Sequence, residues 1–157
     1  MTLAEVAALP VDELAAPDAV LALRIPTPMK PDGLYIMDAW GFEYKTTFYW
    51  IKDYGGARMG MGFWHRGGVE ELLIGKRGAV PPWGIQQPSW IQHPVLEHSR
   101  KPALFRNLVR RATRYMPEVH RVELFARREA LHWISLGYNI SGRDIREELA
   151  LWVANSA

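Results

Sequence analysis

Residues 19–25 read AVLALRI, and this stretch decides the fold class that the sequence predicts. A continuous apolar run, interrupted only by Arg24, is typical of a strand that is buried on both faces, as the inner strands of parallel sheets are. Prolines before and after the run prevent the strand from continuing. We therefore predict a central parallel strand over residues 19–25.

Strand and helix signals alternate along the rest of the chain. Runs rich in β-branched and aromatic residues predict strands, and apolar positions at helical spacing predict helices. The predicted strands are residues 19–25, 44–52, 70–76 and 119–125, and the predicted helices follow Thr2, end at Gly41, begin at Pro102 and cover residues 144–153. This order is typical of a Rossmann-like, mostly parallel sheet between two helical layers. We expect one three-layer α/β domain over residues 1–157, with the strand that ends at Phe125 inside its sheet.

Two long segments have no regular period. Residues 54–69 are rich in glycine, and residues 78–94 are rich in proline, glutamine and tryptophan. Loops of this length are usually functional or disordered. Ligands of doubly wound sheets bind beyond the carboxyl ends of the strands, so we expect Lys52, Arg127, the glycine-rich loop and the turn at residues 99–101 to lie near one another.

Composition limits the classes of function. The chain has 19 Lys and Arg against 17 Asp and Glu, and this net charge of +2 permits a nucleic-acid partner without requiring one. The absence of cysteine excludes disulfides, thiolate metal sites and thiol nucleophiles, and the five histidines show no ligand spacing, so we expect no metal. The start lacks the pattern of a signal peptide, and no apolar run reaches the length of a membrane span. We expect a soluble, cytoplasmic protein.

Basic residues are concentrated between Glu97 and Arg128. The Lys and Arg residues of this part are Arg100, Lys101, Arg106, Arg110, Arg111, Arg114, Arg121, Arg127 and Arg128. On the helix predicted from Pro102, arginines recur at steps of four residues. Such a pattern is typical of a solvated helix face or of a stripe that binds nucleic acid, and the sequence leaves both interpretations open.

Four stretches, in order, carry a resemblance to a known family. They are residues 39–42 (AWGF) with 50–52 (WIK), residues 62–64 (GFW) with Glu70 and 75–78 (GKRG), residues 97–102 (EHSRKP), and residues 123–127 (ELFAR) with Trp133 and Gly137. Together they resemble the MT-A70 family, named for the seventy-kilodalton subunit of the mRNA N6-adenosine methyltransferase, which also has bacterial and phage members that act on DNA. The resemblance extends to about Ile140, and the spacing of the SRKP and ELFAR stretches is its most specific part.

The resemblance implies S-adenosylmethionine as cofactor and the N6 amine of adenine in nucleic acid, DNA more than RNA, as methyl acceptor. The cofactor has a carboxylate and two ribose hydroxyls, which suit a fixed cation and a hydrogen-bonding carboxylate or amide at strand ends and helix starts. By similarity to the family, the cofactor-binding positions are Ser99, Lys101, Glu123, Phe125, Arg127 and Asn139, and the wall of the adenine pocket consists of Trp50, Lys52, Trp64 and Glu70. The position of Asn139 departs from the pattern, because Tyr138 stands where the family commonly has asparagine.

Two tryptophans of these stretches also have a purely structural interpretation. Large aromatic side chains mostly stabilise proteins by filling the core. We expect Trp40 to be a core residue, whereas Trp50, with Lys52 two positions later, fits a core and a pocket equally well.

The family's Asp-Pro-Pro-Trp motif, which ends its first strand, does not occur in this sequence. In that motif a carboxylate and a backbone carbonyl accept the hydrogens of the adenine amine, and an aromatic ring stacks on the base. Residues 80–83, VPPW, begin with a valine that accepts no hydrogen bond and lie late in the second long loop, so we expect an ordinary proline loop there. A second departure is Arg24, where the family usually has tryptophan. The catalytic residues are therefore unknown, and we expect no methyl transfer by this chain alone.

Two hypotheses about function follow. In the first, the chain belongs to an adenine-N6 methyltransferase whose first strand was lost through a misassigned start or a gene break. In the second, it is a catalytically silent subunit that binds nucleic acid or an active partner. A sheet without its first strand would have an open apolar flank, for which we expect a covering partner in a homo- or hetero-oligomer.

Overall fold

The computed structural model describes residues 1–56, 60, 62, 64–95, 103–116 and 118–156. The chain divides into two compact units, a central unit (Pro17–Arg114) and a terminal unit (Met1–Ala16 with Tyr115–Ala157), which are described separately. Both combine helices and strands, which confirms the predicted α/β class. No helix among the described residues is long and apolar enough to span a bilayer.

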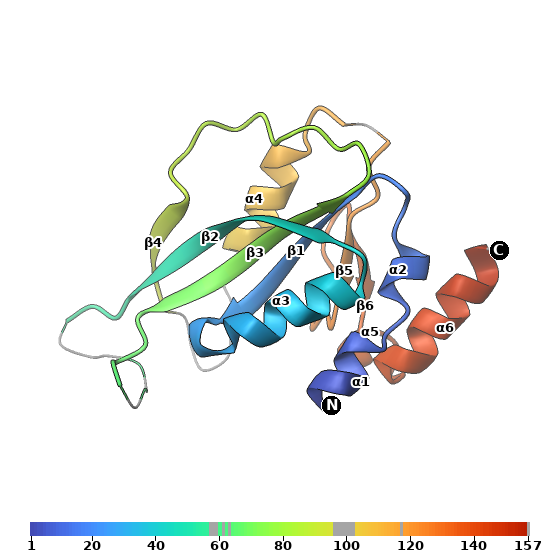
Figure 1. Ribbon diagram of the computed structural model, residues 1–157, viewed down its shortest axis with the longest axis horizontal. Coiled ribbons are helices and arrows are strands. Elements are labelled where there is room, and N and C mark those ends of the chain that lie inside the picture. The colour runs from blue at the N-terminus through green and yellow to red at the C-terminus, as the bar shows by residue number, and fades with distance from the viewer. Residues whose placement is uncertain (57–59, 61, 63, 96–102, 117, 157) are drawn as a thin grey trace. The chain divides into compact units, whose positions relative to one another are not determined.

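The central unit is built on a four-stranded sheet with the order β1-β3-β2-β4 (Figure 1). The strands are β1 (Ala19–Pro26), β2 (Glu43–Asp53), β3 (Val69–Arg77) and β4 (Trp90–Pro94). β3 is antiparallel to both β1 and β2, and β2 and β4 are the one parallel pair of neighbours among the described strands of this sheet. The strands predicted over residues 19–25, 44–52 and 70–76 are thus present, whereas β4 lies in the segment where no period was found.

The prediction of a central parallel strand over residues 19–25 is wrong. β1 stands at one end of the strand order, its only described partner is β3, and its residues are mostly half-buried. The helix after β1 does return the chain so that β1 and β2 run in the same direction. However, β3 follows β2 as a hairpin and lies between them, so β3 is the strand that is buried on both faces. A mostly parallel, Rossmann-like sheet that lacks its first strand remains a prediction for the fold as a whole.

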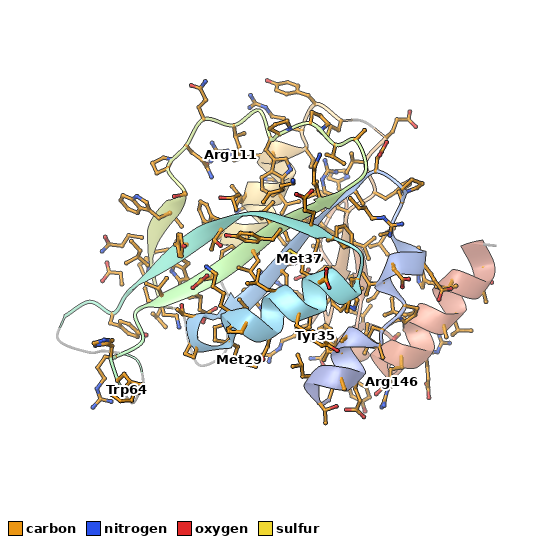
Figure 2. The ribbon with its side chains drawn as sticks, in the orientation of Figure 1. Met29, Tyr35, Met37, Trp64, Arg111 and Arg146 are labelled. Atoms are coloured by element: carbon orange, nitrogen blue, oxygen red, sulfur yellow. The ribbon has the colours of Figure 1, made fainter. Side chains whose placement is uncertain are left out.

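The sheet of the central unit has a helix on each face. On one face, α3 (Lys30–Ala39), entered through the 3-10 turn η1 (Thr27–Met29), contacts β1, β2 and β3. Gly33 permits this close approach, because a Cβ atom there would stand 2.7 Å from the Ile25 Cδ1 and 2.9 Å from the Leu73 Cδ1. Met37, also on α3, is 1% exposed. Figure 2 shows it on the side of this helix next to the sheet. Trp40, which caps the helix, is buried, and this confirms the expected core role.

On the other face, α4 (Leu104–Ala112) packs through Phe105 and Leu108. These two side chains join one buried cluster with four strand residues, Phe48, Trp50, Leu72 and Ile74. Full burial of each such side chain contributes about 1.5–3 kcal/mol. Trp83, in the VPPW stretch, lies partly buried against the same cluster within an irregular segment, which confirms that this stretch is a proline loop.

The terminal unit contains α1 (Leu3–Ala7), α2 (Val11–Leu14), β5 (Val122–Leu124), β6 (Ile134–Leu136), α5 (Tyr138–Ser141) and α6 (Ile145–Ser156). The capping box expected at Thr2 is confirmed, since Thr2 and Glu5 each accept a hydrogen bond from the other's backbone N–H. The strand predicted over residues 119–125 is three residues long and pairs in parallel with β6, in a separate two-stranded sheet. The prediction that this strand lies inside the main sheet is therefore wrong, because among the described strands β5 pairs with β6 alone. That residues 1–157 form one domain remains a prediction.

Candidate functional site

A buried ion pair joins the neighbouring strands β2 and β3 of the central unit. The Lys52 Nζ lies 2.9 Å from the Glu70 Oε1, and the two side chains are 19% and 8% exposed. A carboxylate at this depth requires a cationic or hydrogen-bonding partner, because burial removes its hydration. Lys52 supplies such a partner and also stands 5.6 Å from the centre of the Trp50 ring, in a cation–π contact.

Trp50 holds the strand segment that positions this pair. Its residue pairs directly with Glu70 across the sheet, and its side chain is 2% exposed. The indole ring meets Phe105 of α4 edge to face at 6.4 Å, and its Nε1–H donates to the His93 carbonyl of β4 at 2.9 Å. Trp50 is therefore a core residue that fixes β2, β4 and α4 beside Lys52, so the structural interpretation of this tryptophan is the one that the contacts support.

A surface hollow of about 380 Å³ lies next to the ion pair. Its wall contains Lys52, Asp53, Tyr54, Arg66 and Gln92 together with main chain of the glycine-rich loop. The volume falls within the range of small-molecule sites. Its wall combines these polar side chains with the apolar residues Ile51 and Val69.

Trp64, predicted to belong to the same pocket wall, is placed differently. It is 93% exposed, on the connection between β2 and β3, and Figure 2 shows it at the outer end of that connection. Lys52 and Glu70 thus stand together in the structure, with Trp50 beneath them, while Trp64 points to solvent. Its role in the pocket stays a prediction.

In the terminal unit, three of the predicted cofactor positions lie at or near the carboxyl ends of two parallel strands. Glu123 is on β5, Arg127 follows that strand, and Asn139 follows β6 on α5. Arg127 and Asn139 are exposed, and Glu123 is half-buried. Parallel strands β5 and β6 end at the same edge of their sheet, which is where ligands of α/β proteins bind. That these three residues bind one ligand remains a prediction.

The backbone at these strand ends is unusual in two places. Phe125 adopts a left-handed conformation, with φ 58°, and its side chain is 49% exposed. A bulky residue rarely adopts this conformation, which costs of the order of 1–3 kcal/mol and is found mainly at functional sites. Gly137, the residue after β6, lies close to this turn. A Cβ atom at position 137 would stand 2.6 Å from the Ala126 carbonyl oxygen. The two strand-end loops therefore pass each other at contact distance.

Ser135, which sequence reasoning missed, lies opposite Glu123 in the β5–β6 register. Its Oγ is buried, and no hydrogen-bond partner for it is found among the residues that the structure describes. A buried hydroxyl normally has a partner. No pattern in the sequence distinguishes this serine from the others, and only its pairing with Glu123 in the structure does so.

Ser99 and Lys101, the remaining cofactor positions, lie outside the described residues. The pocket residues belong to the central unit, whereas Glu123, Phe125, Arg127 and Asn139 belong to the terminal unit. The predicted proximity of Lys52, Arg127 and residues 99–101 therefore remains a prediction.

Polar residues beyond the carboxyl ends of parallel strands are typical of α/β proteins that bind a ligand there. Comparison with known proteins narrows this class. The family model described as MT-A70 matches residues 1–139. The chain belongs to the MT-A70 family, which is a family of methyltransferases. It is also 28% identical over 148 residues to the Type II methyltransferase M.MunI of Mycoplasma sp. That alignment covers 92% of this chain and 60% of the relative, so the chain spans less than two-thirds of that relative's length.

Proposed function

We propose that this chain is part of an enzyme that transfers the methyl group of S-adenosylmethionine to the N6 amine of adenine in nucleic acid, DNA rather than RNA. Membership of the MT-A70 family carries the proposal, and the polar groups at the ends of β5 and β6 support it. S-adenosylmethionine supplies the activated methyl group. The chain's own residues have to hold the cofactor, orient the base and exclude water.

The cofactor would be held by groups that match its polar ends. Arg127 and Lys101 are cations suited to its carboxylate, because a fixed guanidinium or ammonium forms charge-assisted hydrogen bonds with it. Glu123, Asn139 and the buried Ser135 hydroxyl suit the two ribose hydroxyls, which both donate and accept. Phe125, whose backbone is left-handed, lies between Glu123 and Arg127 in the chain.

The base would be oriented by the ion pair of the central unit. Glu70 accepts hydrogen bonds and Lys52 donates them, so the pair offers complementary groups to the edge of a purine. Trp50 is too deeply buried to stack on a base and instead keeps the pair in place. The hollow beside Lys52 provides space for a polar group of the substrate.

A transfer assay with radiolabelled S-adenosylmethionine tests the proposal on single- and double-stranded DNA and RNA. Two proteins are compared: the 157-residue chain, and the chain extended by an Asp-Pro-Pro-Trp segment from another family member. We expect transfer to the adenine N6 of DNA by the extended protein and none by the 157-residue chain. Mass spectrometry of the digested product confirms the formation of N6-methyladenine. Transfer to another atom, or no transfer by the extended protein to any of the four polymers, would refute the proposal.

A second candidate is a catalytically silent methyltransferase-like subunit that binds nucleic acid or an active partner. Arg24, at a position where the family usually has tryptophan, favours it. This candidate predicts that the extended protein stays inactive, while the 157-residue chain raises the activity or the DNA affinity of a catalytic relative in a mixture.

A further inference from the structure

The outer face of α4 carries arginines and the neutral, exposed Asn107. Phe105, Leu108 and Ala112 form the buried side of this helix. The opposite side and the turn that follows contain Arg106, Arg110, Arg111 and Arg114, and residues 104–114 include no Asp or Glu. Arg110 and Arg111 are exposed, and among the described residues neither forms an ion pair. Figure 2 shows Arg111 on this helix.

This composition is unfavourable for the helix itself. Residues four apart on a helix are neighbours, so Arg106 and Arg110 are a like-charge pair, which disfavours the helix. A solvated surface helix usually alternates the two signs of charge and gains from it. Cations in the last turn do interact well with the helix dipole, which favours Arg110 and Arg111 at their positions but does not explain the lack of any acid on the helix.

A polyanion would reverse the sign of these interactions. All the basic residues of this face are arginines, whose planar guanidinium groups bind phosphate in a bidentate manner. The helix is also firmly joined to the candidate site, because Phe105 on its inner side contacts Trp50, which supports Lys52 and Glu70. The arginine face and the ion pair are therefore parts of one compact unit.

We propose that the arginine face of α4, through Arg110 and Arg111, binds the sugar–phosphate backbone of duplex DNA. The inference rests on the proposed function, because it takes the substrate to be nucleic acid. The surface contributes affinity without reading sequence, since phosphate contacts position a protein on the duplex and base contacts specify it. An acidic protein partner would be the competing occupant of such a face.

The salt dependence of DNA binding tests the proposal. Fluorescence anisotropy measures the affinity of the 157-residue chain for a labelled 30-base-pair duplex between 50 and 300 mM KCl, without cofactor. Each phosphate contact contributes a slope of about −0.9 to the plot of log K against log salt. The variant Arg110→Gln/Arg111→Gln should therefore have a slope smaller by about 1.8, and roughly 60-fold weaker binding at 0.1 M salt.

Two matched variants isolate the surface from net charge. Lys45→Gln/Arg143→Gln removes the same formal charge from two exposed positions elsewhere, one in each unit, and should keep the wild-type slope. Arg110→Lys/Arg111→Lys keeps the charge and should keep most of the slope while losing some affinity, because an ammonium cannot bind phosphate in a bidentate manner. Circular dichroism and urea midpoints establish that all three variants fold.

Several outcomes would overturn the proposal. These are equal slopes for the two glutamine double variants, no binding of duplex DNA by the wild-type chain at 50 mM KCl, or binding only to an acidic protein. The failure of the proposed function is a separate result, because binding is measured without methyl transfer. A chain that binds through α4 and whose extended form transfers no methyl group would retain this surface and lose the enzymatic role.

Discussion

Two adjacent glutamates on β3 present nearly the same physical chemistry to opposite faces of one sheet. Glu70 is 6% exposed and pairs with Lys52 at 2.9 Å, and Glu71 is 3% exposed and pairs with Lys30 at 2.9 Å. Each lysine also stands near an aromatic ring, Lys52 at 5.6 Å from Trp50 and Lys30 at 5.9 Å from Tyr49. Burial and pairing therefore do not by themselves indicate function.

The surroundings of the two pairs differ. Lys30 is the first residue of α3, so its bond to Glu71 fastens the start of that helix to the sheet. The hydrogen bond from the Lys30 ammonium to Glu71 raises the pKa of Lys30. Lys52, in contrast, lies beside a surface hollow. The Glu71 pair therefore holds α3 to the sheet. That the Glu70 pair contacts a ligand remains our proposal.

The largest expected effect comes from removing the lysines. Lys30→Met leaves the Glu71 carboxylate buried without its cation, and breaking a buried pair in this way typically costs about 3–5 kcal/mol. We expect a loss of about 3 kcal/mol in the free energy of unfolding, measured by urea titration. Lys52→Met should cost less, because Glu70 has a further interaction. Lys45→Met, at an exposed pair, is the control and should change stability by under about 1 kcal/mol. A loss of under about 1 kcal/mol for Lys30→Met, no more than for the control, would show that the pair with Glu71 does not hold α3 to the sheet.

The second effect separates function from stability. In the protein extended by an Asp-Pro-Pro-Trp segment, Glu70→Gln should lower kcat/KM for adenine methylation about tenfold, equivalent to about 1.4 kcal/mol of transition-state stabilisation. Glu71→Gln makes the same chemical change one residue along the strand, so it is a matched control that should keep wild-type kinetics. Urea midpoints of both variants show how much stability each loses. Equal losses of kcat/KM would break the comparison and make both pairs structural.

The main errors of prediction have identifiable physical reasons. The strand over residues 44–52 was predictable because it is rich in threonine and aromatic residues, and Trp40 was predictable as core. The neighbours of each strand were not predictable, because an apolar run such as residues 19–25 does not state which strand pairs with it. Of the candidate site, the residue types at the strand ends followed from a family resemblance. The partner of Glu70, the exposure of Trp64 and the left-handed Phe125 depend on tertiary contacts that no local pattern encodes.

A third effect concerns alkaline pH. Because the pKa of Lys30 is raised in the folded state, the pair with Glu71 contributes its full stability below the unfolded lysine pKa, about 10.4. That contribution is lost as the pH rises through the higher folded pKa. The difference in stability between the wild type and Glu71→Gln should thus be constant from pH 8 to 10 and shrink above. In the Lys30→Arg variant the side chain stays charged in this range. The stability difference between Lys30→Arg and the Lys30→Arg/Glu71→Gln double variant should therefore persist up to pH 11.5, as measured by urea midpoints. If the stability difference between the wild type and Glu71→Gln persisted in the same way above pH 10, the charge of Lys30 would not be its source.

The smallest effect is expected at an exposed pair, which sets the lower limit of the comparison. Asp144 precedes α6 and accepts hydrogen bonds from the Arg146 side chain, with Nε at 2.8 Å, and from the Arg146 backbone N–H at 2.9 Å. The side-chain bond is the main reason why the pKa of Asp144 falls to about 2. A depressed pKa means that the pair stabilises the fold above the unfolded value, about 3.9, and that this contribution disappears as the pH falls toward 2.

The stability difference between the wild type and Asp144→Asn should therefore be present at pH 5 and vanish near pH 2, and carbon NMR of the Asp144 carboxyl reports its pKa directly. Because the pair lies in water, 1 M NaCl should move that pKa toward 3.9, as screening weakens exposed charge pairs. The same salt should leave the stability loss of Lys30→Met nearly unchanged, because the Glu71 carboxylate is shielded from solvent. If salt weakened both pairs equally, then Glu71 would be more accessible than its burial indicates, and the contrast between a structural and a ligand-accessible pair on β3 would have to be abandoned.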